Sequence, residues 1–189
     1  DVAMDFGIAY GGWVPRGRKT EAGPLPEKYA HMQESASRRY GERTLRNVVE
    51  SDGTLIISRG KLTGGSRLTA DIARQYGRPC LHVDLSTTFR FKAAEVIRSW
   101  IVDQRVEVLN VAGPRASSDP EIYQTVYDIL QTAFFMDMAL SSRPGGFFHY
   151  GAASRPPVRR HGPETIEAAV ERLMDALSLR DKATIARLS

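Results

Sequence analysis

The alternation of short apolar runs with longer amphipathic segments constrains the fold of this chain more than any other feature. Strands are predicted at residues 54–58, 81–85 and 106–111, and helices follow them at 66–76, 91–104 and 120–135. Parallel strands need a long crossover, usually a helix, so this order predicts βαβ units. The predicted class is therefore α/β, with a parallel sheet and helices on both of its faces. Within the helix at 91–104, Ala94, Val96, Ile97 and Ile101 are expected to face inward. Before these units, we predict a short strand at 8–10, a long irregular loop to about Tyr29 and a helix at 40–50.

The C-terminal part of the chain follows a different pattern. Residues 141–146 and 154–160 are rich in Gly, Pro and Ser or Arg, which is typical of linkers. Ile166, Val170, Leu173 and Leu177 then form one apolar face of a helix. We predict a Rossmann-like, three-layer ligand-binding domain over 1–135, a linker over 136–162 and a small helical hairpin over 163–189. Because a helical pattern ends at Gly7, only six residues into the chain, a further segment is expected upstream.

Composition narrows the class of protein. The chain is 42% hydrophobic and 25% charged, and none of its apolar runs approaches the roughly 20 residues that cross a bilayer. The only cysteine, Cys80, falls in a strand with the apolar pattern of a buried one, which predicts a packed thiol and a reducing, cytoplasmic location. The net charge of +4 suits an anionic ligand, and it equally suits a mildly basic protein without one.

Two loops follow predicted strands and should meet at the carboxyl edge of the sheet, where open α/β folds bind ligands. In the first loop, glycines and free N–H groups at a helix start could hold an anion, although such glycines also occur for steric reasons. In the second, an arginine could bind phosphate or molybdate oxygens, or meet only solvent. The candidate residues are Thr63, Gly64, Gly65 and Ser66, with Asn110, Gly113, Pro114 and Arg115.

Other polar clusters are less specific. Arg16, Arg18 and Lys19 lie beside Trp13 and could form a lid over an anion or a nucleic-acid contact, but a solvated loop is the simpler interpretation. The four histidines are scattered, no His, Cys or carboxylate spacing predicts a metal site, and phosphate-binding, dinucleotide-binding and Gly-x-Ser-x-Gly motifs are absent.

Several blocks in the same order resemble the molybdenum carrier family, over about residues 1–134. They are Gly-Gly-Trp-Val-Pro-Arg-Gly-Arg at 11–18, Gly-Pro-Leu-Pro-Glu-Lys-Tyr at 23–29, Arg43-Thr44 with Asn47-Val48, Ser-Asp-Gly-Thr-Leu-Ile at 51–56, Leu-Thr-Gly-Gly at 62–65 and Leu-Asn-Val-Ala-Gly-Pro-Arg at 109–115. The resemblance implies binding of molybdenum cofactor or molybdate, and it adds Arg16, Arg43 and Asn47 to the candidate ligand-binding residues. The family opens with a strand and a Gly-Gly-Gln-Thr-Gly loop before its first helix, so the resemblance also implies a first strand and a Gly-rich loop upstream of residue 1.

The same resemblance extends to the cytokinin-activating phosphoribohydrolases, which carry Gly-Gly-x-Gly-Thr-x-x-Glu. Here the matching stretch is Gly64-Gly65-Ser66-Arg67-Leu68-Thr69-Ala70-Asp71, so the glutamate is replaced by an aspartate. Asp71 is therefore the candidate catalytic acid if the chain is an enzyme that cleaves an N-glycosidic or phosphoester bond in a nucleotide. The alternative is a surface ion pair between Asp71 and Arg74 on one helix.

Three functions follow from these observations. The first is a carrier or sensor that binds a small anionic ligand, such as molybdenum cofactor, molybdate or a nucleotide, without catalysis. The second is the nucleotide hydrolase that uses Asp71. The third is an interaction protein that recruits a partner through its helical tail. A homo-oligomer is expected from the apolar helix faces, whereas nucleic acid and membranes are not expected as partners.

Overall fold

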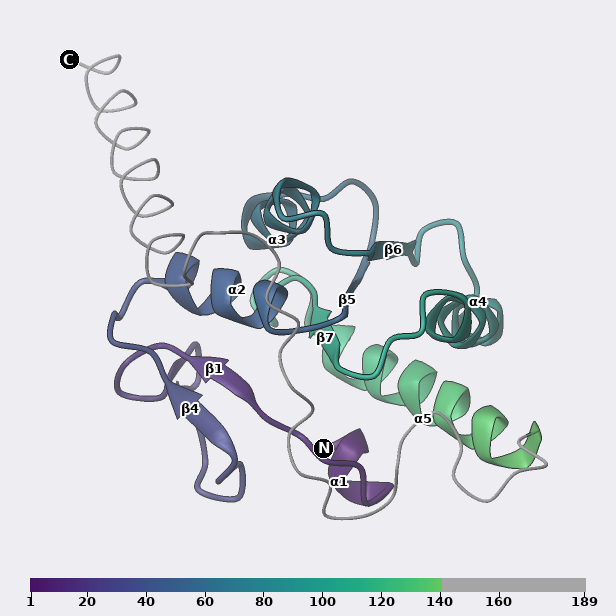
Figure 1. Ribbon diagram of the computed structural model, residues 1–189, viewed down its shortest axis with the longest axis horizontal. Coiled ribbons are helices and arrows are strands. Elements are labelled where there is room, and N and C mark those ends of the chain that lie inside the picture. Colours follow the sequence, from purple (N-terminus) through teal and green to yellow (C-terminus); the bar gives the residue numbers. More distant parts are fainter. Residues whose placement is uncertain (141–189) are drawn as a thin grey trace.

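The computed structural model describes residues 1–140, and its centre is a parallel sheet between two layers of helices (Figure 1). The strand order is β6-β5-β7, with β5 at Gly53–Ser58, β6 at Cys80–Asp84 and β7 at Leu109–Ala112. Both neighbours run parallel to β5. The predicted α/β class, a Rossmann-like three-layer parallel sheet with helices on both faces, is confirmed.

The two helical layers bury different faces of the sheet. On one face, α4 (Arg90–Asp103) and α5 (Ile122–Leu140) pack with Leu55 and Ile57 of β5 into the main hydrophobic core. On the other, α2 (Tyr40–Val49) and α3 (Gly64–Gln75) pack against each other through a smaller core that contains Leu45, Val48 and Ile72. Successive side chains of a strand point to opposite faces, so a central strand between two helical layers must be apolar or small throughout. Every residue of β5 is buried.

The N-terminal segment adds short strands beside α2. It contains α1 (Val2–Asp5), β1 (Gly12–Val14), β2 (Lys19–Thr20), β3 (Gly23–Pro24) and β4 (Met32–Glu34), with β1 parallel to β4 and β2 antiparallel to β3. The expectation of a strand at residues 8–10 was wrong, because pairing begins only at Gly12. The expected irregular loop is instead organised by Arg18, whose guanidinium donates to the carbonyls of Leu25, Pro26, Tyr29 and Met32 at 3.0 to 3.5 Å.

Two further expectations about side chains were wrong. Cys80 is exposed and not packed, because β6 is the outer strand of the described sheet. Val96 was expected to face inward, but the buried residues of α4 are Ala93, Ala94, Ile97 and Ile101. Both differences have one cause, since periodicity shows which residues share a face but not which strand or helix lies at the border of the fold.

The last described helix ends later than predicted. Helix α5 continues past the expected end near Phe135 to Leu140, and neither Gly nor Pro interrupts the chain in between. The rest of the predicted linker and the whole predicted hairpin at 163–189 lie outside the described residues. Within the part of the chain that the structure describes, none of the helices has the length and apolarity needed to span a membrane.

Candidate functional site

The carboxyl edge of the sheet is where helix α3 starts. Helix α3 follows β5 directly, so its first N–H groups and its positive dipole end lie at this edge. Helix α2 precedes β5, so its C-terminus lies near the start of that strand. A hydrogen bond from Arg78, just after α3, to the carbonyl of Val49 joins the C-terminal ends of both helices.

The start of α3 leaves open space above its backbone. Thr63 has an extended backbone at the N-cap and no side-chain capping bond, and Gly64 has a φ of +49°. A Cβ added to Gly64 or Gly65 would meet no atom within 4 Å. Thr63, Gly64 and Gly65 are exposed, whereas Ser66 is buried. Packing therefore does not explain Gly65, and a ligand could approach this backbone closely.

The loop after β7 contains structural residues and one exposed arginine, Arg115. Asn110 donates from its side chain to the Thr54 hydroxyl within the sheet, at 3.2 Å. Gly113 passes so close to β5 that a Cβ there would lie 2.8 Å from the carbonyl oxygen of Ile57. Pro114 is half-buried, and Arg115 extends outward beyond it. Of these four candidates, Arg115 is the one with donors available to a ligand.

Arg115 reaches the N-terminus of α2 and meets a second candidate there. The guanidinium of Arg43 lies 5.6 Å from the centre of the Tyr40 ring, and that of Arg115 lies 5.0 Å from the same ring. Arg43 is largely buried, and its Nε atom is inaccessible to solvent and has no hydrogen-bond partner among the described residues. Burial lowers the pKa of Arg43, and the nearby charge of Arg115 lowers it further. Two cations therefore share one aromatic ring at the site.

A carboxylate from a distant segment reaches the same loop. Glu21, at the turn between β2 and β3, accepts a hydrogen bond from the Ser117 hydroxyl at 2.7 Å and one from its N–H at 3.3 Å. It also lies 3.9 Å from the Nε atom of Arg115. The hydrogen bond from the Ser117 side chain is the main reason that the pKa of Glu21 is lowered. This corner of the molecule thus already holds one anionic group.

The remaining candidates lie apart from this cluster or have other contacts. Asn47 binds the main chain of Trp13 in both directions, accepting from its N–H at 2.7 Å and donating to its carbonyl at 3.1 Å. The side chain of Arg16 is exposed. Asp71 lies 3.2 Å from Arg74 and 3.7 Å from Arg67, so the ion pair with Arg74 on one helix is present. No group of three or more His, Cys, Asp and Glu within residues 1–140 could hold a metal ion.

Sequence reasoning missed three residues of the site. Both arginines lie over the ring of Tyr40, while Glu21 and Ser117 form the contact across the loop. None of them belongs to a Gly-rich motif, and their neighbours in the sequence carry no signal. The one available signal was the spacing of an aromatic and a basic residue, Tyr40 and Arg43, three positions apart in the first turn of the predicted helix.

Comparisons with known proteins agree with this architecture. Residues 1–134 match the model of the circularly permutated YpsA SLOG family. The crystal structure of a protein named "putative molybdenum carrier protein" from Syntrophus aciditrophicus SB is similar, with 52% sequence identity and a TM-score of 0.69, over 70% of this chain and 84% of that one. A comparison with curated protein sequences finds no match. The family match and the structural neighbour together show that this chain belongs to the circularly permutated YpsA SLOG family, a molybdenum carrier-like group.

Proposed function

We propose that the carboxyl edge of the sheet binds the oxyanion group of a small ligand and that the protein acts as its carrier. The observation that supports this most directly is the pair of arginines beside Tyr40. Arg43 is largely buried and its Nε atom lacks an acceptor. An unsatisfied buried donor costs about 1–3 kcal/mol, and more when it is charged. An oxyanion would supply the missing acceptor and reduce the repulsion between Arg43 and Arg115.

The surrounding backbone favours the same chemistry. The N–H groups at the start of α3 lie at this edge, and helix N-termini attract anions. The open space above Gly64 and Gly65 lets an oxygen atom approach the main chain. Thr63, Gly64, Gly65 and Ser66 would then contact one oxyanion group, and Arg43 with Arg115 would neutralise its charge.

Molybdate and the phosphate of molybdenum cofactor both present oxygen atoms, and so does the phosphate of a nucleotide. The donors at this edge are N–H, guanidinium and hydroxyl groups, which fit oxygen atoms and do not coordinate molybdenum directly. One similar protein of known structure is named a putative molybdenum carrier, which favours molybdate or the cofactor as the ligand. In this proposal the protein binds and releases the ligand without a chemical step.

Calorimetric titration of the full chain with molybdate, inorganic phosphate, a nucleoside monophosphate and molybdenum cofactor tests the proposal. Arg43→Lys keeps the charge but removes the Nε donor, and Arg115→Gln removes a charge from the exposed part of the site. Each should weaken binding of the preferred anion about tenfold or more, because charge-assisted hydrogen bonds contribute roughly twice as much as neutral ones.

Arg105→Asn is the matched control, since Arg105 is exposed, lies between α4 and β7 at the opposite edge, and has a φ of +52° that asparagine tolerates. The proposal fails if none of the four ligands binds. It also fails if Arg105→Asn weakens binding as much as the two site variants do.

A further inference from the structure

The outer edge of β6 carries main-chain groups that no described residue binds. Thr54 donates to the carbonyl of Pro79 at 2.9 Å, and Leu85 donates to the carbonyl of Ser58 at 2.8 Å. In a parallel pair of strands, these two bonds fix which residues of β6 direct their main-chain groups to β5. Residues 81 and 83 therefore bond to β5, while the N–H and C=O groups of Cys80 and His82 point away from the sheet. Such a free edge is a template for another strand.

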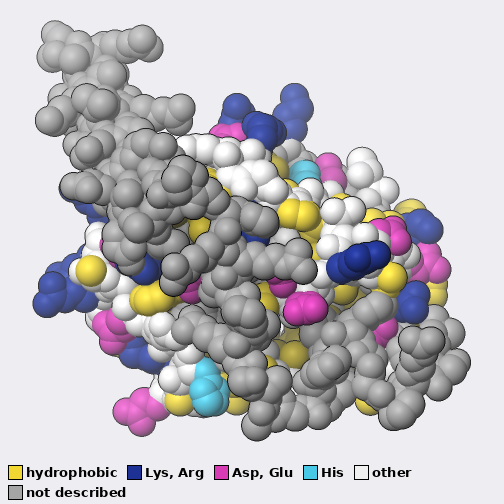
Figure 2. All heavy atoms as spheres, in the orientation of Figure 1, with side chains coloured by type: hydrophobic (Ala, Val, Ile, Leu, Met, Phe, Trp, Pro, Cys, Tyr) yellow, Lys and Arg dark blue, Asp and Glu magenta, His cyan; other side chains and the backbone are white. Residues whose placement is uncertain are grey.

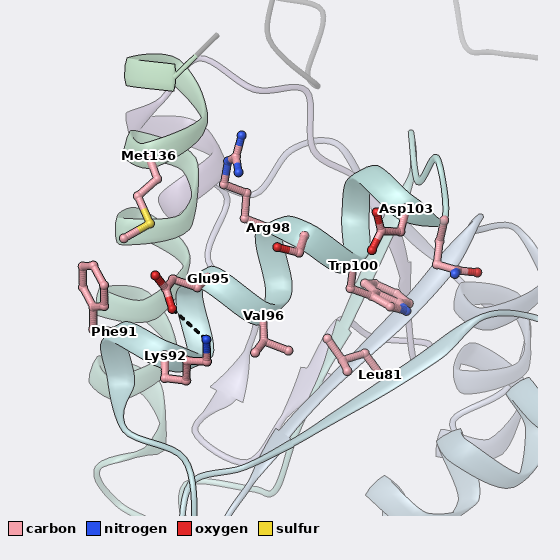
Figure 3. Close-up of a pocket in the computed structure, with 11 residues that line it drawn as sticks. Leu81, Phe91, Lys92, Glu95, Val96, Arg98, Trp100, Asp103 and Met136 are labelled. Carbon is pink, nitrogen blue, oxygen red and sulfur yellow. Dashed lines mark hydrogen bonds and ion pairs between the residues drawn. The ribbon is translucent and has the colours of Figure 1, made fainter.

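A cavity flanks this edge on each face of the sheet. On the α4 side, a cavity of about 680 Å³ has an apolar inner wall of Leu81, Val96 and Trp100 (Figure 3). On the α3 side, a cavity of about 360 Å³ is lined by Leu62, Ala70, Arg74, Arg78, Cys80 and His82. The side chains of an added strand would alternate between these two faces, so each cavity would receive every second residue.

The two cavities differ in charge. On the α3 side, Arg74 and Arg78 line the cavity and no carboxylate is among its described lining residues. Asp71 pairs with Arg74 from the helix, and Arg78 also donates to the carbonyl of Val49. Figure 2 shows Lys and Arg side chains gathered over α3. On the α4 side the charges are balanced, since Lys92 pairs with Glu95 at 3.0 Å and Arg98 lies 3.9 Å from Asp137. The α3 side thus favours acidic side chains, whereas the α4 side offers an apolar wall.

We propose that β6 binds an extended segment of a partner protein as an added strand, with acidic side chains on the α3 side and apolar side chains on the α4 side. Main-chain bonds to Cys80 and His82 would hold the segment, and the two cavities would select its sequence. A second copy of the chain fits less well, because a symmetric pair of β6 strands would place the basic side of one copy beside that of the other. The proposal is independent of anion binding at the site described above.

The probe is a blocked peptide of about ten residues that alternates glutamate with valine, and a peptide that alternates lysine with valine is its control. Fluorescence anisotropy with the full chain should show binding of the first peptide alone. Arg74→Glu should weaken that binding about fivefold, as expected for an exposed charge contact. Arg67→Glu is the matched control on the same helix, since Arg67 is equally exposed but does not line the cavity.

A second pair of variants tests the main-chain contact. His82→Pro removes an N–H group at the free edge, where proline is tolerated, while His82→Val removes the imidazole and keeps the N–H group. Peptide binding should be lost in the proline variant and kept in the valine variant. Hydrogen exchange of the unmodified chain should show that the peptide slows exchange at the Cys80 and His82 amides, and this readout remains available if the proline variant does not fold.

Three results would overturn the proposal. The first is equal binding of the acidic and the basic peptide, and the second is equal loss in Arg67→Glu and Arg74→Glu. The third is a chain that self-associates without peptide and already protects the Cys80 and His82 amides, which would assign the edge to a second copy.

Discussion

Gly64 and Gly65 are adjacent, but they are glycines for different physical reasons. Gly64 has a φ of +49°, where a side chain is strained, whereas a Cβ on Gly65 would enter open space. Gly64→Ala should therefore lower the free energy of unfolding by about 1–2 kcal/mol. Gly65→Ala should leave stability unchanged or raise it by up to about 1 kcal/mol, because alanine favours the helix. If the open space holds the anion, Gly65→Ala will nevertheless weaken its binding.

Urea denaturation measures the first effect and calorimetric anion titration the second. A Gly65→Ala variant that binds molybdate and phosphate with unchanged affinity would show that the ligand does not approach this backbone.

Glu21 holds donors that an anion at Arg115 would also use. Its carboxylate accepts from both the hydroxyl and the N–H of Ser117 and lies near Arg115. Glu21→Gln removes the competing charge while it preserves the size of the side chain, so we expect tighter anion binding in calorimetric titration. Glu27→Gln, an exposed carboxylate in the same N-terminal segment, is the control and should have no effect. Weaker binding in Glu21→Gln would mean that this carboxylate supports the site.

At the scale of elements, one side chain joins β1 to α2. Asn47 binds the main chain of Trp13 through two hydrogen bonds, and a Cβ on Gly12 would lie 3.0 Å from its Oδ1 atom. The indole N–H of Trp13 also donates to Glu50, and Arg46 lies over its ring at 4.6 Å. The contact of β1 with α2 is thus polar, and hydrophobic patterning could not have shown it.

Asn47→Ala should detach β1 from the helix. It removes both hydrogen bonds and leaves the Trp13 main chain unsatisfied, so we expect a loss of about 1–3 kcal/mol in the free energy of unfolding. Amide exchange at residues 12–14 should accelerate and the fluorescence of Trp13 should change. Gln33→Ala, on the exposed side of the neighbouring strand β4, should alter neither. If amide exchange at residues 12–14 is unchanged in Asn47→Ala, the side chains around Trp13 are sufficient to hold β1 against α2 in the absence of Asn47.

At the scale of the whole molecule, Asp84 ties together the loops that follow β5 and β6. Its carboxylate accepts from the N–H of Gly60 at 2.7 Å and from that of Ser86 at 2.8 Å. The hydrogen bond from Ser86, followed by that from Gly60, lowers the pKa of Asp84 in the folded protein. A lowered folded-state pKa adds stability above the unfolded pKa of about 4, and this stability is lost as the pH falls through the folded pKa.

Asp84→Asn should therefore be less stable than the unmodified chain at neutral pH, and the difference should shrink on acidification below about pH 4. Thermal unfolding from neutral to acid pH measures this convergence. Asp103→Asn, an exposed carboxylate at the end of α4, should follow the unmodified chain throughout. If the difference in stability between Asp84→Asn and the unmodified chain is the same at every pH, the charge of Asp84 does not contribute to stability.

Most of the fold could be predicted, because its central elements carry strong local patterns. The apolar run at residues 54–58 lies within β5, and the predicted helices at 66–76 and 91–104 overlap α3 and α4. The errors fall at the outer strand and on the outer helix faces of the fold, where the local sequence does not show whether a residue is covered by a neighbouring element. Cys80 looked buried because its neighbours are apolar, and Val96 was assigned to the inner face of α4 although it lines an outer cavity.

The candidate site was predictable only in part. A strand followed by Thr63, Gly64, Gly65 and Ser66 indicated the edge of the sheet, and the structure places Arg115 at the same edge. The different contacts of Gly65 and Gly113 could not be predicted, because a glycine in open space and a glycine against a carbonyl look identical in the sequence. The resemblance added Arg43 and Asn47 to the candidates. In the structure, Arg43 lies beside Tyr40, whereas Asn47 binds the main chain of Trp13.

The sequence by itself determined the alternating elements, the central position of the most apolar strand and the sheet edge at which the two candidate loops lie, because these depend on periodicity and chain direction. The tertiary structure alone decided which polar groups meet there. Segments that are distant in the chain contribute Tyr40, Arg115 and Glu21. Hydrophobic burial brings these segments together, and no local sequence pattern predicts their contacts. The free edge of β6 was decided in the same way, since pairing between strands is a property of the assembled sheet.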